Sequence, residues 1–292
     1  MRMRARWMVV VAGTTLLVGG YAVPLWVIPP IAAGGLLYPL RRPITQRLPA
    51  PCSDVVLDGV GVSLKGWQCR VPAEPRGTVI FLHGVADNRG GVAGAVDRFV
   101  RKQIDVVAYD SRAHGESTGD VCTYGFSEKR DLGKVLDTLR PGPVVLLGTS
   151  LGAAVALQAA ADDKRVKGIV AAEVFSDLRT VARERAPGFL TEGIIARAFG
   201  MAEGRGAFRV DEVSPVEAAR RIDVPVLLIH GADDTDTPPE HSRRVFAALA
   251  GPKELLLVKG ARHNESLRRE DTWQRIDLWV DAILRSRSTP PM

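Results

Sequence analysis

The feature that most constrains this fold is an alternation of short apolar runs with longer helical runs along most of the 292 residues. Eight runs have the length and composition of strands: 54–57, 62–70, 78–82, 105–109, 144–147, 168–172, 226–229 and 254–258. Helical patterns cover 91–101, 127–139, 151–161, 240–250 and 272–285. Because strand–helix alternation builds parallel sheets covered on both faces, the chain predicts an α/β fold with a mostly parallel sheet of about eight strands.

One interval departs from this alternation. About fifty residues separate Ala172 from Pro225, and they include the weakly helical stretch APGFLTEGIIARAFGMAEGRG. Long inserts of this kind are commonly functional, and ligands of such sheets bind at the carboxyl ends of the strands. We therefore predict a helical lid over about 176–222 within a catalytic domain of residues 52–288. A helical decoration far from any site is the alternative.

The stretch PVVLLGTSLGAAVALQAA, residues 143–160, places Ser150 between a buried strand and a helix-forming run. A chain that turns so sharply forces the residue at the apex into sparsely populated backbone angles. Gly148 and Gly152 leave room for that turn, and the G-x-S-x-G spacing is that of a nucleophile elbow. Ser150 is thus the candidate nucleophile, with a simple Gly-Ser turn as the alternative.

A serine hydroxyl needs a base that removes its proton. His263 lies in the loop GARHNES after the last strand run, where its ring can hang over the sheet edge that carries Ser150. The other histidines have weaker claims: His83 and His230 end strands, His114 lies in a polar turn, and the ring of His241 is expected to face solvent. The acid that orients His263 is expected in LIHGADDTDTPPE, where the sequence alone does not rank Asp233, Asp234 and Asp236.

Acyl chemistry also needs two backbone N–H groups for the oxyanion. Leu151 opens a helix whose first N–H groups have no internal partner. Val85 in HGVADN is the candidate for the second, beside Gly84, which permits a close backbone approach. We expect no metal and no organic cofactor.

The excess positive charge lies at the amino end of the chain. Residues 1–47 hold six arginines and no acidic residue or lysine, so the remainder contains 33 basic and 33 acidic residues (39 − 6 = 33). Because nucleic-acid binding needs a basic face on the folded domain, we expect no nucleic-acid partner.

The arginines flank an apolar segment, Trp7 to Leu40, that lacks Asp, Glu, Lys and Arg. We predict that residues 1–47 form an uncleaved membrane anchor, either a single span or a Pro-bent hairpin. A cleaved secretory signal is the alternative. The catalytic domain is expected outside the cytoplasm, with a secreted or cytoplasm-facing domain as alternatives.

Two of the three cysteines flank the hairpin-like run SDVVLDGVGVSLKGWQ. Pairing about its turn sets Cys52 opposite Cys69, which is close enough for a disulfide. Two unpaired thiols are the alternative. Such a bridge would favour an oxidising compartment. Nothing near Cys122 indicates a nucleophile.

Five strings in order resemble the α/β-hydrolase superfamily: FLHGVADN, YDSRAHGESTG (with Ala113 where glycine is usual), GTSLG, HGADDTDTPPEHS and GARHNE. The resemblance covers about residues 54–285 and implies the α/β-hydrolase fold. It also implies Asp234 as the acid, four residues before the loop proline. The membrane-anchored branch and the serine-aminopeptidase-like and monoacylglycerol-lipase-like groups are the most similar.

The sequence therefore predicts a serine hydrolase that cleaves a carboxylic ester, a lipid or a thioester through an acyl-enzyme, with a hydrophobic acyl substrate. An aminopeptidase is the first alternative. It would need an acidic lid residue to hold a substrate ammonium, and Glu184, Glu192 and Glu203 are the candidates. A non-catalytic, membrane-tethered binding module is the second alternative.

Overall fold

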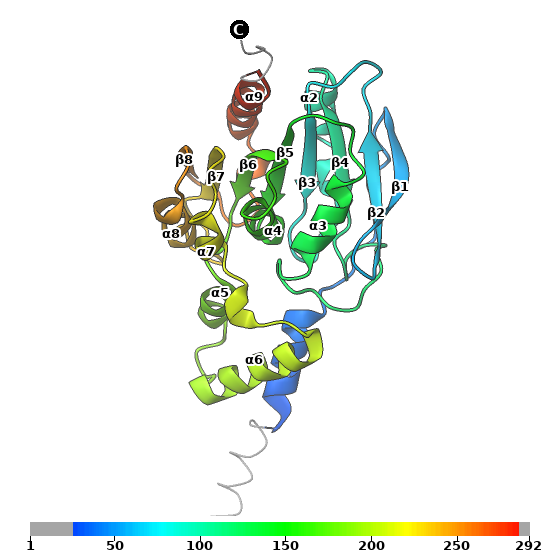
Figure 1. Cartoon of the computed structure of the whole chain (residues 1–292). Coiled ribbons are helices and arrows are strands. Elements are labelled where there is room, and N and C mark those ends of the chain that lie inside the picture. The colour runs from blue at the N-terminus through cyan, green and yellow to red at the C-terminus, as the bar shows by residue number, and fades with distance from the viewer. Residues whose placement is uncertain (1–25, 286–292) are drawn as a thin grey trace, which may run out of the picture.

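A central eight-stranded sheet dominates the computed structural model, which describes residues 26–285 (Figure 1). Its strand order is β1-β2-β4-β3-β5-β6-β7-β8. The strands are β1 Cys52–Asp58, β2 Ser63–Cys69, β3 Thr78–Leu82, β4 Asp105–Tyr109, β5 Val144–Thr149, β6 Val166–Ala172, β7 Val226–Gly231 and β8 Lys253–Val258. Only β1–β2 and β2–β4 pair antiparallel within the described sheet, so the predicted mostly parallel sheet of about eight strands is confirmed.

Helices cover both faces of the sheet. They are α2 Val96–Val100, α3 Glu128–Leu136, α4 Leu151–Ala160, α7 Pro215–Ala219, α8 Glu240–Ala248 and α9 Glu270–Arg285, with short 3-10 turns at Arg89–Val92, Val210–Glu212 and Ser266–Arg268. α3, α4, α7 and α8 share one buried cluster with one face of the sheet, while α2 and α9 pack on the other. The central strands β3, β4 and β5 are buried at every position, which explains their continuous apolar sequences.

The long interval between β6 and β7 is helical. It contains α5 Leu178–Glu184 and α6 Glu192–Gly206, followed by α7. Side-chain caps fix where these weak helices begin, because Asp177 accepts the Thr180 N–H and Thr191 accepts the Ile194 N–H. In Figure 1, α5 and α6 lie below the sheet, beside the blue N-terminal helix.

That N-terminal helix spans 26–37 and packs against α6. Ala33 and Leu37 are almost fully buried, and the Leu37 carbonyl accepts the Cys122 N–H at 2.8 Å. Arg205 of α6 donates to the Pro30 carbonyl at 3.2 Å. Within residues 26–285, no helix is both long and apolar enough to cross a bilayer. The remaining part of the predicted anchor, residues 1–25, lies outside the described residues.

The linker that follows this helix is fixed by Arg41. Its guanidinium donates to the carbonyls of Ser117 at 2.5 Å and Gly119 at 2.6 Å, with longer bonds to those of His114 and Gly115. An arginine that the sequence placed beside a membrane segment thus binds the loop after β4. This contact joins the amino end of the described chain to the sheet.

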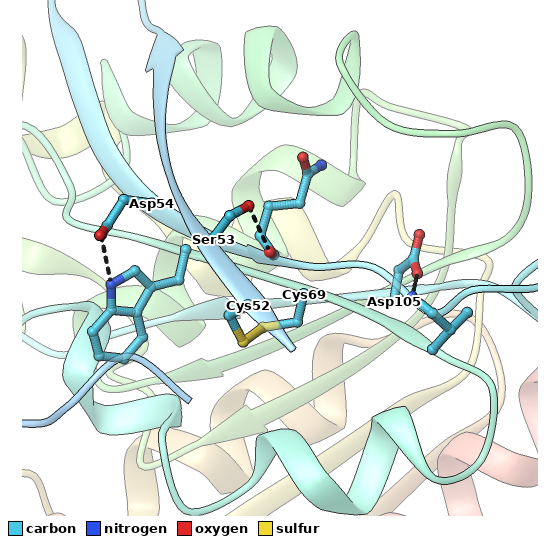
Figure 2. The surroundings of a disulfide bond; sticks show 8 residues. Cys52, Ser53, Asp54, Cys69 and Asp105 are labelled. Atoms are coloured by element: carbon cyan, nitrogen blue, oxygen red, sulfur yellow. Dashed lines mark hydrogen bonds between the residues drawn. A yellow bond between two sulfur atoms is a disulfide. The ribbon is translucent and has the colours of Figure 1, made fainter. Parts of the chain in front are cut away.

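The hairpin of β1 and β2 has the register expected from its sequence, with Cys52 opposite Cys69. The two cysteines form a disulfide (Figure 2). Around it, Trp67 Nε1 donates to Asp54 at 3.0 Å, and the Val71 N–H donates to Asp105 at 2.9 Å. Cys122 is a buried free thiol, and burial raises its pKa well above the usual value, so it is unreactive.

We expect the native protein to show no maleimide-reactive thiol at Cys52 or Cys69 before reduction. Reduction should lower the free energy of unfolding by about 3 kcal/mol, because the bridge closes a loop across a sequence separation of 17 residues. Denaturant titrations with and without reductant measure this difference. Cys122 is the internal control, since its buried thiol should react only after unfolding. Rapid labelling of Cys52 or Cys69 in the folded, unreduced protein would contradict the bridge.

Candidate active site

Ser150 occupies the sharp turn between β5 and α4. Its backbone has φ 49° and ψ −109°, a left-handed conformation that costs energy for a residue other than glycine. Its N–H donates to the Ala172 carbonyl at 2.8 Å, which ties the turn to the end of β6. Gly148 and Gly152, on either side of Ser150, lie so close together that a Cβ added at Gly148 would be 2.4 Å from the Gly152 carbonyl carbon.

Three side chains in hydrogen-bond contact join three loops at the carboxyl ends of the strands. Ser150 Oγ lies 3.2 Å from His263 Nε2, and His263 Nδ1 lies 2.6 Å from Asp234 Oδ2. Because a carboxylate only accepts, the Nδ1 nitrogen carries the proton and Nε2 presents its lone pair to the hydroxyl. The structure thus brings together the serine, histidine and aspartate singled out in the sequence, while Asp233 and Asp236 remain exposed.

Asp234 is buried and strongly hydrogen-bonded. Its Oδ1 accepts the N–H groups of Asp236 and Thr237, each at 2.9 Å. Burial alone would raise the pKa of Asp234, but hydrogen bonds from His230, His263 and Thr237 outweigh burial and hold that pKa well below its usual value. Asp234 is therefore ionised at neutral pH and suited to stabilise a protonated His263.

The loop after β3 faces this elbow. The Gly84 carbonyl accepts from His83 Nδ1 at 2.7 Å and from the Asp87 N–H at 3.2 Å. Because N–H and C=O of a trans peptide point in opposite directions, the Val85 N–H points away from His83. Burial lowers the pKa of His83, and its Nε2 accepts the Ser111 N–H at 2.9 Å, so the ring is a neutral support for this loop.

A pocket of about 410 Å³ opens beside these groups. Its walls are Val85, Ser150, Glu184, Arg185, Thr235, Asp236, His263 and Asn264. In the part of the chain that the structure describes, no cluster of three or more His, Cys, Asp and Glu side chains is arranged to hold a metal ion. Ser150 and His263 thus both line this pocket.

Comparison with known proteins identifies the fold. Residues 77–193 match the family model described as the alpha/beta hydrolase fold. The uncharacterized protein YqkD of Bacillus subtilis is 31% identical over 219 residues, which cover 72% of each chain. The chain belongs to the α/β-hydrolase family. The uncharacterized protein YfhR of Salmonella typhi is 25% identical over 285 residues, which cover 90% of each chain.

Among solved structures, the esterase Pf2001 of Pyrococcus furiosus has the same fold. It superposes with a TM-score of 0.69 at 22% identity, covering 85% of this chain and 99% of the esterase chain. At this identity the likeness concerns the fold.

This α/β hydrolase departs from the usual family sequence in the loop after β4, where Ala113 replaces the usual glycine. The φ of Ala113 is 63°, which lies in the region that favours glycine. The alanine therefore adopts the glycine conformation at this position.

Glu173 is a contributor that the sequence analysis missed. It follows β6 directly, is fully buried, and accepts the N–H groups of Asn264 at 2.7 Å and Ser266 at 3.2 Å as well as the Ser266 hydroxyl. These bonds fix the backbone on the carboxyl side of His263. A lone acidic residue directly after the buried run VKGIVAA was the available signal in the sequence.

We expect a Glu173→Gln variant to fold and to lose about 10- to 100-fold in kcat/KM for a soluble ester. The amide keeps the shape but directs one donor toward other donors, which displaces the loop that carries His263. Glu265→Gln is the matched control, since the half-buried Glu265 accepts the Arg262 N–H in the same loop through a solvent-exposed hydrogen bond. Circular dichroism and ester kinetics measure both variants, and equal activities would contradict this role for Glu173.

His241 corrects one expectation, because its ring is buried rather than facing solvent. Its Nδ1 accepts the Ser176 N–H at 3.1 Å, and its Nε2 donates to Glu184 at 2.7 Å. His241 is buried because α5 and the loop before it cover the start of α8. The spacing of residues along α8 could not indicate this contact with a distant segment. The contact ties α5 to the start of α8 at the edge of the pocket.

Proposed function

We propose that this protein is a serine hydrolase that cleaves a carboxylic ester or thioester through an acyl-enzyme. The observation that carries the proposal is the continuous relay from Ser150 through His263 to a buried, ionised Asp234. A serine hydroxyl on a strained turn, within reach of a correctly protonated imidazole, is the arrangement that nucleophilic catalysis requires.

The reaction follows from these positions. Ser150 Oγ attacks the acyl carbonyl carbon while His263 Nε2 takes the hydroxyl proton, and Asp234 stabilises the resulting imidazolium. The oxyanion accepts hydrogen bonds from the N–H groups of Leu151 and Val85. The C–O or C–S bond then breaks, and His263 returns the proton to the leaving alcohol or thiol. Water, deprotonated by His263, attacks the acyl-enzyme and releases the acid.

An aminopeptidase is less well supported because each candidate acid in the lid already has a basic partner. Glu184 contacts His241 at 2.7 Å and Arg244 at 3.8 Å. Glu192 forms an ion pair with Arg183, and Glu203 lies 3.8 Å from Arg209. A substrate ammonium at any of the three carboxylates would therefore share it with a basic side chain that is already bound there. The relay itself argues against a non-catalytic binding module.

A fluorophosphonate probe tests the proposal. We expect it to label the wild-type protein covalently and to leave Ser150→Ala unlabelled, with unchanged circular dichroism in the variant. Absence of labelling in the wild type would refute the hydrolase, and labelling that persists in Ser150→Ala would move the nucleophile to another residue.

We also propose that the apolar amino-terminal segment anchors the domain to a membrane, with the domain outside the cytoplasm. The apolar sequence from Trp7 to Val23 and the bridge between Cys52 and Cys69 support this placement. Protease treatment of intact cells, with lysed cells as the control, should digest the domain in both samples. Protection in intact cells would place the domain in the cytoplasm.

A further inference from the structure

A second cavity, of about 360 Å³, lies between the N-terminal helix over 26–37, α5 and α6. Its lining includes Ala33 and Leu36 of the first helix, Val181 of α5, and Ile194 and Ala198 of α6. Except for Tyr124 and Arg185, all its side chains are hydrocarbon or, at Gly35, hydrogen. An occupant with many hydrogen-bonding groups would leave them without partners here, so the cavity favours an apolar occupant.

This cavity adjoins the pocket of Ser150. Arg185 lines both hollows. Its Nε donates to the Asp236 carbonyl at 2.9 Å, and its guanidinium also binds Thr237 Oγ1, so the charged head is fixed on the acid loop. The methylene stem of Arg185 is then the part able to face an apolar neighbour. Arg185 is thus a side chain that the two hollows share.

The cavity also lies at the same edge of the sheet as the serine. Tyr124 in its lining packs edge-on against Phe175, with ring centroids 6.3 Å apart. Phe175 follows the end of β6 by three residues, and Ala172 at that end accepts the Ser150 N–H. A lining residue of the cavity therefore contacts the segment that follows β6, and the elbow is bound to the end of the same strand.

We propose that this cavity binds the hydrocarbon chain of an acyl substrate whose carbonyl carbon lies at Ser150 Oγ. The helix over 26–37 is then a wall of the substrate site. The inference rests on the proposed ester hydrolysis and names its substrate class, esters or thioesters of medium- and long-chain fatty acids. A volume near the lower end of the roughly 300–1,000 Å³ range of ligand sites fits one chain.

The test uses full-length protein and p-nitrophenyl esters from acetate to dodecanoate. For the wild type, kcat/KM should rise about fourfold per added methylene until the cavity is full. Ala198→Phe fills the cavity from α6. It should lower kcat/KM for dodecanoate at least about tenfold while acetate stays within about twofold. Ala33→Phe repeats the test from the opposite wall, should one variant fail to fold.

Gly200→Phe is the matched control on the same helix, because Gly200 is exposed and an added Cβ there meets no atom within 4 Å. It should leave the chain-length profile unchanged. A variant-free measurement uses alkyl fluorophosphonates of increasing length on the wild type, and the rate of Ser150 labelling should rise with length. A flat profile in the wild type, or a long-chain preference that both cavity-filling variants retain, would overturn the acyl cavity while labelling still supports the hydrolase. Without any labelling, the proposed hydrolysis itself fails.

Discussion

An Asp234→Asn variant is expected to fold and to lose about 10⁴-fold in kcat. The reason lies in the backbone around the carboxylate. Oδ1 accepts the N–H groups of Asp236 and Thr237, so an amide at this position must place its oxygen there. Its NH₂ group then faces His263 Nδ1, which must accept. The imidazole proton moves to Nε2, and the ring can no longer take the proton of Ser150.

Asp236→Asn is the matched control in the same loop. The Asp236 side chain is exposed, and its backbone N–H and carbonyl make the contacts to Asp234 and Arg185. Its kcat should stay within about threefold of the wild type, since the Asp236 side chain lines the same pocket but is not a member of the relay. Steady-state ester kinetics and thermal melting measure both variants. If Asp236→Asn were the more damaging change, the assignment of the acid would be wrong.

The central strands could be predicted because they are buried on both faces, and their sequences are therefore apolar throughout. β3, β4 and β5 are short continuous apolar runs, and the β1–β2 hairpin register follows from alternation about one turn. The first predicted helix was less accurate. The run over 91–101 predicted one helix, but α2 begins at Val96 after a separate 3-10 turn. Gly90, Gly91 and Gly94 explain the difference, since glycine disfavours a continuous helix.

The candidate site shows the limit of sequence reasoning more clearly. Ser150 and His263 could be singled out from local pattern and loop position, but physical reasoning left Asp233, Asp234 and Asp236 equivalent. Burial and two backbone donors separate them, and these depend on how the loop folds. The hydrogen bond that Glu173 accepts from the Asn264 N–H joins residues 91 positions apart, so no local sequence pattern could predict it.

The amino-terminal helix illustrates the same limit. Its apolar sequence predicts membrane contact, and the packing of Ala33 and Leu37 against the domain satisfies the same hydrophobicity in another way. Exposed apolar side chains remain on this helix, with Trp26 70% and Ile31 67% exposed. The apolar sequence alone thus does not distinguish packing against the domain from contact with a membrane, which explains why hydropathy could not place this segment.

A Gly152→Ala variant is expected to be severely destabilised. A Cβ there would lie 2.0 Å from the Leu82 carbonyl oxygen and 2.4 Å from the Leu82 carbonyl carbon. These are backbone atoms of β3, which is paired with β4 on one side and β5 on the other and so cannot yield. α4 must move instead, at an expected cost of about 3 kcal/mol or more in the free energy of unfolding.

Gly200→Ala separates this steric effect from the general effect of replacing a helical glycine. Gly200 lies within α6 with no atom within 4 Å of an added Cβ, so alanine there should stabilise by about 0.5–1 kcal/mol. Thermal melting should therefore shift in opposite directions, with a fall of about 6 °C or more for Gly152→Ala. A Gly152→Ala protein as stable as the wild type would mean that β3 and α4 do not approach so closely. The position of the Leu151 N–H beside the loop of Val85 depends on that approach.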